Sequence, residues 1–210
     1  MKVLILGASG LVGSNAVAQT LAHPAVTAVI APTRKPLPPG SKLTNPVAEQ
    51  LESLLPEALA WGVDAVICAL GTTMAQAGSR EAFRQVDYVL PLAFARVAHQ
   101  QGAETLALVS AIGASVSSSF FYPRTKGEVE RDTKLVGLKS LTILRPSIIS
   151  GNRDKSRFAE GIALGLSRIL APILPKKFHV NPAPKIAAVL VDSIIAAEPG
   201  CHYLYAESLV

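Results

Sequence analysis

Short hydrophobic runs alternate along this chain with longer segments in which apolar residues recur at helical spacing. The clearest runs are residues 3–6, 27–30, 64–70, 105–109 and 141–144. They lack the polar alternation of a strand with one wet face, so they predict strands buried on both faces of a parallel sheet. Shorter strands are expected near residues 42–44 and 202–205.

The predicted helices lie between these runs, at residues 11–21, 48–60, 80–101, 123–135, 157–170 and 185–197. Residues 80–101 are expected to form one long helix or a bent pair of helices. Strands that alternate with helices predict an α/β fold with a doubly wound, Rossmann-like parallel sheet. Without internal repeats or a linker, residues 1–210 are expected to form a single domain.

Composition and charge exclude several classes of protein. Of the 210 residues, 50% are hydrophobic and 17% are charged, which excludes a disordered chain. No uncharged apolar run reaches the roughly 18–20 residues of a bilayer helix, so we expect no membrane partner. The net charge of +5 comes from scattered basic residues, so we expect no nucleic-acid partner either.

The cysteines and histidines indicate the compartment and argue against a metal site. Cys68 and Cys201 are too few for a disulfide framework and lack metal-site spacing, so both are expected to be buried thiols of a cytoplasmic protein. The four histidines also lack ligand spacing, and no metal is expected.

A glycine-rich turn joins the first strand to the first helix: Gly7-Ala8-Ser9-Gly10-Leu11-Val12-Gly13. Glycines at such a turn permit a tight backbone and the close approach of a pyrophosphate, which then faces backbone N–H groups at the helix N-terminus. The position after a strand and before a helix therefore predicts a dinucleotide site. Its expected contacts are Gly7, Ser9, Gly10, Leu11, Val12 and Gly13.

The residues after the second strand indicate which dinucleotide is bound. An NAD-specific site usually carries an acidic residue there for the ribose 2′-hydroxyl. This chain has no Asp or Glu before Glu49 and instead places Arg34 and Lys35 after the strand. Two cations suit a 2′-phosphate, so the prediction is NADP(H), with NAD(H) as the alternative.

Tyr122 and Lys126 form a Tyr-x-x-x-Lys pair near the start of a predicted helix. Positions i and i+4 share a helical face, and a nearby ammonium lowers the pKa of a phenol, which is about 10 in free tyrosine. Ser110, which ends the preceding strand, is the candidate for orienting a substrate oxygen; Ser117, Ser118 and Ser119 are alternatives. The same helix offers two ordinary i,i+4 ion pairs, Arg124 with Glu128 and Lys126 with Glu130.

The order of these motifs resembles the short-chain dehydrogenases/reductases over essentially the whole chain. The nearest resemblance is to the atypical, short NAD(P)H-binding group that includes the human Tat-interactive tumour-suppressor oxidoreductase. It is carried by Ala69-Leu70-Gly71-Thr72-Thr73, Ala77-Gly78-Ser79, Val86-Asp87 and Phe121-Tyr122-Pro123-Arg124-Thr125-Lys126-Gly127-Glu128.

The resemblance implies roles for several residues. Tyr122 and Lys126 would be catalytic, with Lys126 also holding the nicotinamide ribose. Leu70, Gly71 and Thr72 would contact the cofactor, and Pro146 with Ser147 would lie beside the nicotinamide.

Three features depart from the family pattern. The Asn-Ala-Gly segment common in classical members is replaced by Cys68-Ala69-Leu70-Gly71. Asp87 stands where many extended members have an asparagine, which puts an asparagine-based proton relay in doubt. Pro123 follows the tyrosine directly, and a residue before proline disfavours the α region, so Tyr122 is expected at the helix cap.

These observations predict an NADP(H)-dependent oxidoreductase that transfers hydride to or from a small carbonyl or alcohol, as a monomer or homodimer. The alternatives are an NADP(H)-binding sensor without catalysis and an epimerase or dehydratase. Residues 146–210 are expected to contribute a small C-terminal substrate lobe, too short for a nucleotide-sugar site. Arg153 and Arg157 in that lobe could bind an anionic group.

Overall fold

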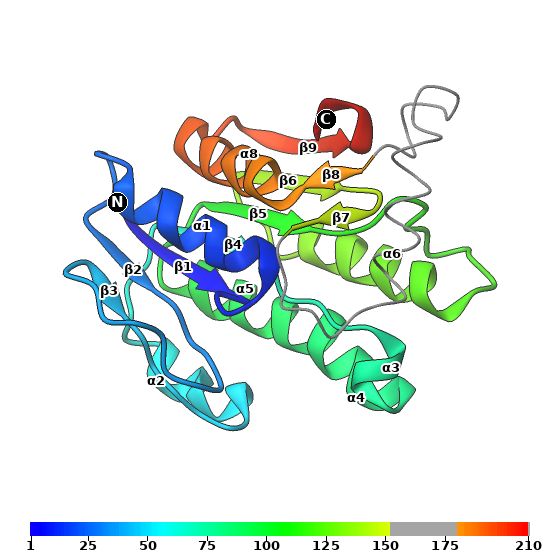
Figure 1. Cartoon of the computed structure of the whole chain (residues 1–210), viewed down its shortest axis with the longest axis horizontal. Helices are drawn as coiled ribbons and strands as arrows, with labels where there is room; N and C mark the ends of the chain where they lie inside the picture. Colours follow the sequence, from blue (N-terminus) through cyan, green and yellow to red (C-terminus); the bar gives the residue numbers. More distant parts are fainter. Residues whose placement is uncertain (152–179, 210) are drawn as a thin grey trace.

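A seven-stranded parallel sheet forms the centre of the protein in a computed structural model that describes residues 1–151 and 180–209 (Figure 1). The strand order is β3-β2-β1-β4-β5-β6-β9. The strands are β1 (Lys2–Leu6), β2 (Ala28–Ile30), β3 (Leu43–Thr44), β4 (Ala65–Cys68), β5 (Thr105–Val109), β6 (Ser140–Arg145) and β9 (Gly200–Tyr205). This order, in which the chain reverses direction across the sheet beside β1, confirms the predicted doubly wound Rossmann-like fold.

Helices cover both faces of the sheet. On one face lie α1 (Leu11–Ala22) and α8 (Ala183–Ala196), and on the other lie α2 (Leu55–Ala58), α5 (Leu90–Gln100) and α6 (Phe121–Lys134) (Figure 1). Between β4 and α5 the chain forms α3 (Met74–Ala77), α4 (Arg80–Arg84) and a π turn (Gln85–Val89). A small ribbon pairs β7 (Ile149–Ser150) with β8 (Asn181–Pro182), and two 3-10 turns span Leu51–Leu54 and Ala206–Leu209.

Successive residues of the strands supply two separate cores. In β1, Val3 and Ile5 pack toward α1 and α8, whereas Leu4 and Leu6 pack toward α2, α5 and α6. Every side chain of β4 and β5 is buried. This two-sided burial explains why the strands read as continuous hydrophobic runs in the sequence.

Two predicted helices differ from the structure at their ends. The helix expected at residues 48–60 is a 3-10 turn followed by the short α2, with Pro56 in its first turn, where the missing N–H is tolerated. The helix expected from Pro123 begins at Phe121, which places Tyr122 inside the first turn and not at the cap. Pro123 lies in that same turn, where helical N–H groups have no intrahelical partner to lose.

The helical segment expected at residues 80–101 runs without a break through α4, the π turn and α5, to Gln100. The π turn lies within it, and Pro91 follows at the start of α5. The helix expected at residues 157–170 lies outside the described residues. Among the helices that the structure describes, none is both long and apolar enough to cross a membrane.

Candidate functional site

The glycine turn is held by close backbone contacts between β1, α1 and β4. Gly7 has φ +80°, and a Cβ added to it would lie 2.5 Å from the Ala69 carbonyl oxygen. A Cβ on Gly13 would lie 2.0 Å from the Gly7 carbonyl oxygen. Glycine is therefore required at both positions by the fold itself.

The N-terminus of α1 suits an anion. Gly10 is the N-cap, its N–H donates to the Gly7 carbonyl at 2.8 Å, and neither a capping side chain nor an acidic residue occupies the first turn. Ser9 is exposed and Leu11 is partly buried, whereas the Val12 side chain packs in the core. Val12 therefore has only its backbone to offer a ligand.

Gly13→Ala is expected to destabilise the protein by about 1–3 kcal/mol or more, because the added methyl group overlaps backbone atoms that α1 cannot move away from without unpacking. Urea unfolding measures the loss. Gly40→Ala is the matched control, since its Cβ would make an ordinary 3.5 Å contact with the Leu43 side chain. Equal free energies of unfolding for the two variants would show that the turn is looser than the structure indicates.

The cations after β2 lie on a turn that is fixed by hydrogen bonds. Arg34 and Lys35 are exposed, while Thr33 is buried and its hydroxyl donates to the Lys35 carbonyl at 2.7 Å. The Asn45 amide donates to the Thr33 hydroxyl at 2.8 Å and to the Ala31 carbonyl at 2.6 Å. Asn45 was not singled out from the sequence, where it is one polar residue in a proline-rich loop.

Tyr122 and Lys126 lie one helical turn apart on α6. The Tyr122 residue is 41% exposed, and its ring packs edge-on against the buried ring of Phe83, with centroids 5.7 Å apart. Lys126 is 5% exposed, and its Nζ lies 2.7 Å from Oδ1 of Asp87. The structure thus gives the phenol access to solvent and holds the ammonium inside.

Lys126 is charged at neutral pH despite its burial. Burial alone disfavours the ammonium and lowers its pKa, but the negative charge of Asp87 and the nearby Tyr122 oxygen outweigh that effect. The pKa of Lys126 consequently lies above its ordinary value. A buried cation beside an exposed phenol is an arrangement suited to acid–base chemistry.

The loop after β4 reaches the same place. Leu70, Gly71 and Thr72 follow the strand, and the Thr72 N–H donates to Oδ2 of Asp87 at 2.8 Å. Asp87 therefore links the predicted cofactor contacts of this loop to Lys126 on α6.

In the structure the Ser110 side chain is engaged by another side chain. Its buried hydroxyl donates to Oε1 of Glu130, which is itself bound by the Arg145 guanidinium at 3.0 Å. The predicted substrate-orienting role would require Ser110 to exchange this bond. Of the alternative serines, Ser117 is exposed and hydrogen-bonded to Ser115 at 2.9 Å.

Both ion pairs expected within α6 are replaced by pairs with other elements. Glu128 binds Arg84 of α4, Glu130 binds Arg145 of β6, and Lys126 binds Asp87 of the π turn. The i,i+4 spacing is worth only about 0.2–0.5 kcal/mol, so tertiary partners readily displace it.

Pro146 and Ser147 are fixed by backbone contacts after β6. The Pro146 carbonyl accepts from the Ile112 N–H at 2.9 Å, and the Ser147 N–H donates to Oδ1 of Asn181 at 2.8 Å. Asn181 is fully buried and also donates to the Ala206 carbonyl at 2.9 Å. Asn181 could not be recognised from the sequence, because nothing in its neighbourhood predicts a partner 34 residues earlier. Arg153 and Arg157 lie outside the described residues.

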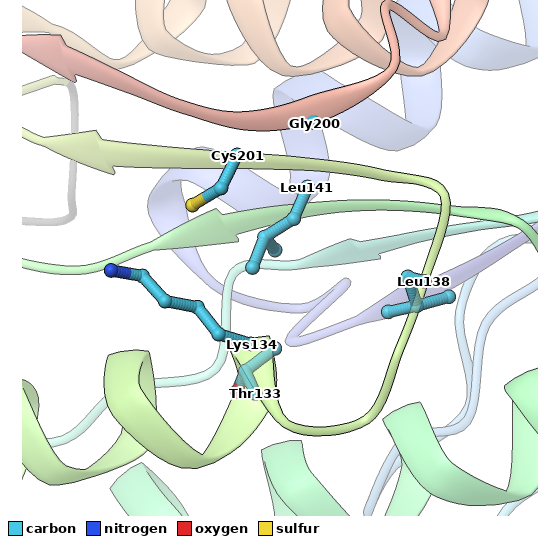
Figure 2. Close-up of a pocket in the computed structure, with 6 residues that line it drawn as sticks. All are labelled: Thr133, Lys134, Leu138, Leu141, Gly200 and Cys201. Carbon is cyan, nitrogen blue, oxygen red and sulfur yellow. The ribbon is translucent and has the colours of Figure 1, made fainter.

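A hollow of about 250 Å³ lies beside the amino-terminal ends of β6 and β9 (Figure 2). It is lined by Thr133, Lys134, Leu138, Leu141, Gly200 and Cys201, from the end of α6 and the starts of β6 and β9. Figure 2 shows Lys134 and Cys201 on its opposite walls. Cys201 is exposed, so the expectation of two buried thiols holds for Cys68 alone. Cys201 lies near the start of the outer strand β9.

No cluster of three or more His, Cys, Asp or Glu residues that could hold a metal ion occurs within residues 1–151 and 180–209.

The candidate site is composed of the glycine turn, the loops after β2, β4 and β6, and the start of α6. All of these lie at the carboxyl edge of the parallel strands, where open α/β sheets bind ligands.

Two solved structures share this fold at low sequence identity. MoeE5 in complex with UDP-glucose and NAD aligns with a TM-score of 0.75 at 18% identity, covering 97% of this chain and 75% of that one. The UDP-N-acetylglucosamine 4-epimerase from Bacillus cereus aligns with a TM-score of 0.70 at 16% identity, covering 98% and 75%. At this identity the likeness establishes the Rossmann-like fold alone.

Sequence relatives identify the family. The family model described as HIM1 matches residues 41–175. The protein fmp52, mitochondrial, of Aspergillus clavatus is 39% identical over 171 residues, which cover 76% of this chain and 71% of the relative. FMP52, mitochondrial, of Eremothecium gossypii is 31% identical over 172 residues, covering 81% and 77%. The chain belongs to the HIM1 family.

The expectation of a cytoplasmic protein is wrong, because these relatives are named as mitochondrial proteins. The expectation relied on two cysteines without disulfide or metal spacing. Cysteine content separates oxidising from reducing compartments and does not distinguish one reducing compartment from another.

Proposed function

We propose that this protein is an NADP(H)-dependent oxidoreductase that transfers hydride to or from a small carbonyl or alcohol, in the manner of the atypical short-chain dehydrogenases/reductases. The observation that carries the proposal is the placement of the exposed Tyr122 phenol one helical turn from the buried, charged Lys126. The glycine turn lies at the same edge of the sheet.

The residues present fit a dinucleotide. The backbone of Gly7 and Gly13 closes a turn that no Cβ could enter, and α1 begins with free capping positions. In this proposal the turn holds the pyrophosphate, Arg34 and Lys35 hold the 2′-phosphate, and Lys126 holds the nicotinamide ribose. The bound nicotinamide supplies or accepts the hydride.

Tyr122 is assigned the proton. Its Oη donates a proton to the carbonyl oxygen during reduction and takes it back from the alcohol during oxidation. The Lys126 ammonium lies one helical turn from this phenol, and the Phe83 ring packs edge-on against the Tyr122 ring and orients it.

The surroundings of Tyr122 support an uncharged substrate. Residues 110–123 carry no charged side chain. Ile112, Val116 and Phe120 in this segment are exposed large hydrophobic residues. Exposed apolar groups of this kind gather at binding sites, and they favour a small apolar aldehyde or ketone.

Cofactor choice is tested by thermal melting. A ligand raises stability by RT ln(1 + [L]/Kd), so NADPH is expected to raise the Tm more than NADH at equal concentration. Arg34→Gln with Lys35→Gln should weaken NADPH binding about tenfold or more and leave NADH nearly unchanged, because charge-assisted hydrogen bonds to the 2′-phosphate are lost.

The control is the double variant Arg96→Gln with Lys139→Gln, which removes the same charge from α5 and from the residue before β6. It should keep the parent preference. A larger Tm shift with NADH than with NADPH in the parent protein would overturn the assignment of NADP(H). If neither cofactor shifted the Tm, both the proposed oxidoreductase function and the alternative of an NADP(H)-binding sensor would be overturned.

A further inference from the structure

A buried carboxylate connects three parts of the candidate site. Asp87 is 1% exposed and lies in the π turn between α4 and α5. Its Oδ1 lies 2.7 Å from Lys126 Nζ, and its Oδ2 accepts from the Thr72 N–H at 2.8 Å. π turns are inserted single turns that often occur at functional sites, and this one aims Asp87 at α6.

The titratable groups that face this carboxylate come from β4 and α6. On the β4 side, burial raises the pKa of Cys68 to about 11, so this thiol is neutral at physiological pH. On the α6 side stand Lys126 and Tyr122. Among the described residues, Lys126 and Asp87 thus form an oppositely charged pair at the centre of this cluster.

Other groups between the π turn region and α6 are already paired with one another. Arg84 binds Glu128, and the Tyr88 hydroxyl donates to Asp132 at 2.7 Å. Asp132 also binds Arg131 at 2.7 Å. Within residues 1–151 and 180–209, these pairs leave Asp87 as the carboxylate that contacts Lys126.

We propose that Asp87 is a positioning residue, which keeps the buried Lys126 ammonium charged and joins it, through the Thr72 N–H, to the loop between β4 and α3. This inference rests on the proposed function of Tyr122 and Lys126. A buried lysine without a facing anion readily loses its proton, since desolvation can lower a lysine pKa by several units. A neutral asparagine at this position could donate and accept hydrogen bonds but could not balance the charge.

The sign of the effect follows from charge alone. A nearby anion favours the protonated form of any titratable group. Removing the anion therefore lowers the pKa of a lysine ammonium and of a tyrosine phenol alike. Both limbs of the pH–activity profile should therefore move to lower pH in Asp87→Asn, by about one unit or more. A variant that merely disturbed packing would lower the rate without moving the limbs.

The direct test is an NMR titration of the lysine ε-methylene groups in the cofactor-free protein, with Lys126→Met used to assign the signal. Asp87→Asn and Asp87→Ala should each lower the pKa of Lys126 by about one unit or more. Asp132→Asn is the matched control, because Asp132 also bridges α6 and the π turn but does not contact Lys126. It should leave the Lys126 titration unchanged.

If Asp87→Asn does not fold, the double variant Asp87→Asn with Lys126→Met decides the question. Recovery of the fold in the double variant supports charge balance, whereas equal instability assigns Asp87 to packing and overturns the inference. An unshifted Lys126 pKa in a folded Asp87→Asn variant overturns it as well. The titration needs neither cofactor nor turnover, so a parent protein without oxidoreductase activity would overturn the proposed function and leave this test standing.

Discussion

Replacing Tyr122 by Phe is expected to lower the rate of NADPH-dependent carbonyl reduction by about 10²–10⁴-fold, which is the usual contribution of a general acid or base. The phenylalanine ring keeps the edge-on contact with Phe83 but has no proton to transfer. NADPH binding should remain near the parent value, because the proposal assigns the dinucleotide to the glycine turn and to Lys126. Initial rates over a panel of small aldehydes, ketones and quinones measure the loss.

Two further variants make the result specific. Tyr205→Phe, on the outer strand β9, changes an equally exposed tyrosine and should keep the parent rate. Lys126→Met should lower both rate and NADPH affinity, since Lys126 is assigned to the ribose and to the tyrosine. A Tyr122→Phe variant that turns over a good substrate at the parent rate would refute the acid–base role. NADPH binding without turnover of any substrate would favour the sensor.

The parts of the site that could be predicted from the sequence are those determined by neighbours in the chain. The glycine turn follows a strand and opens a helix, so its conformation depends on residues 7–13 and on the adjacent elements. Tyr122 and Lys126 lie on one face because four residues make about one helical turn. The buried strands were recognisable because both of their faces are apolar.

The contacts that could not be predicted join residues far apart in the chain. Lys126 pairs with Asp87, and Glu130 pairs with Arg145 of β6, although each also has an opposite charge four residues away or less on its own helix. Burial decides between these partners, because an ion pair removed from water is much stronger than a solvated one. Sequence spacing does not show which individual charged side chains are buried in the folded protein.

Proline positions show the same division between local and tertiary effects. Pro123 disfavours a helical conformation for Tyr122, yet α6 begins at Phe121. The adjoining loop fixes this start, since the Ser115 N–H donates to the Pro123 carbonyl at 3.0 Å. A Cβ on Gly127 would lie 2.3 Å from the Ser115 backbone, so the loop packs directly on the helix. These tertiary contacts outweigh the local preference.

Glu130→Gln is expected to reduce the free energy of unfolding by about 3 kcal/mol, because it leaves a largely buried cation without its counterion. The Glu130 side chain is 3% exposed and binds Arg145, whose guanidinium also lies 4.7 Å from the Tyr203 ring. The same carboxylate accepts the Ser110 hydroxyl, so the substitution weakens the link between β5, α6 and β6. Urea unfolding with a common m-value measures the loss.

Glu128→Gln is the matched control on the same helix. Glu128 pairs with Arg84, and the two side chains are 20% and 38% exposed, so solvent screens the pair and the expected loss is below about 1 kcal/mol. The double variant Glu130→Leu with Arg145→Met should recover much of the stability lost in Glu130→Gln, since a buried ion pair replaced by apolar residues leaves no charge uncompensated. Similar losses for Glu130→Gln and Glu128→Gln would mean that the Glu130–Arg145 pair is solvated in the folded protein. In that case the hydrogen bond from Ser110 to Glu130 would be weaker. The Ser110 hydroxyl could then exchange it for a substrate oxygen, as its position at the end of β5 first suggested.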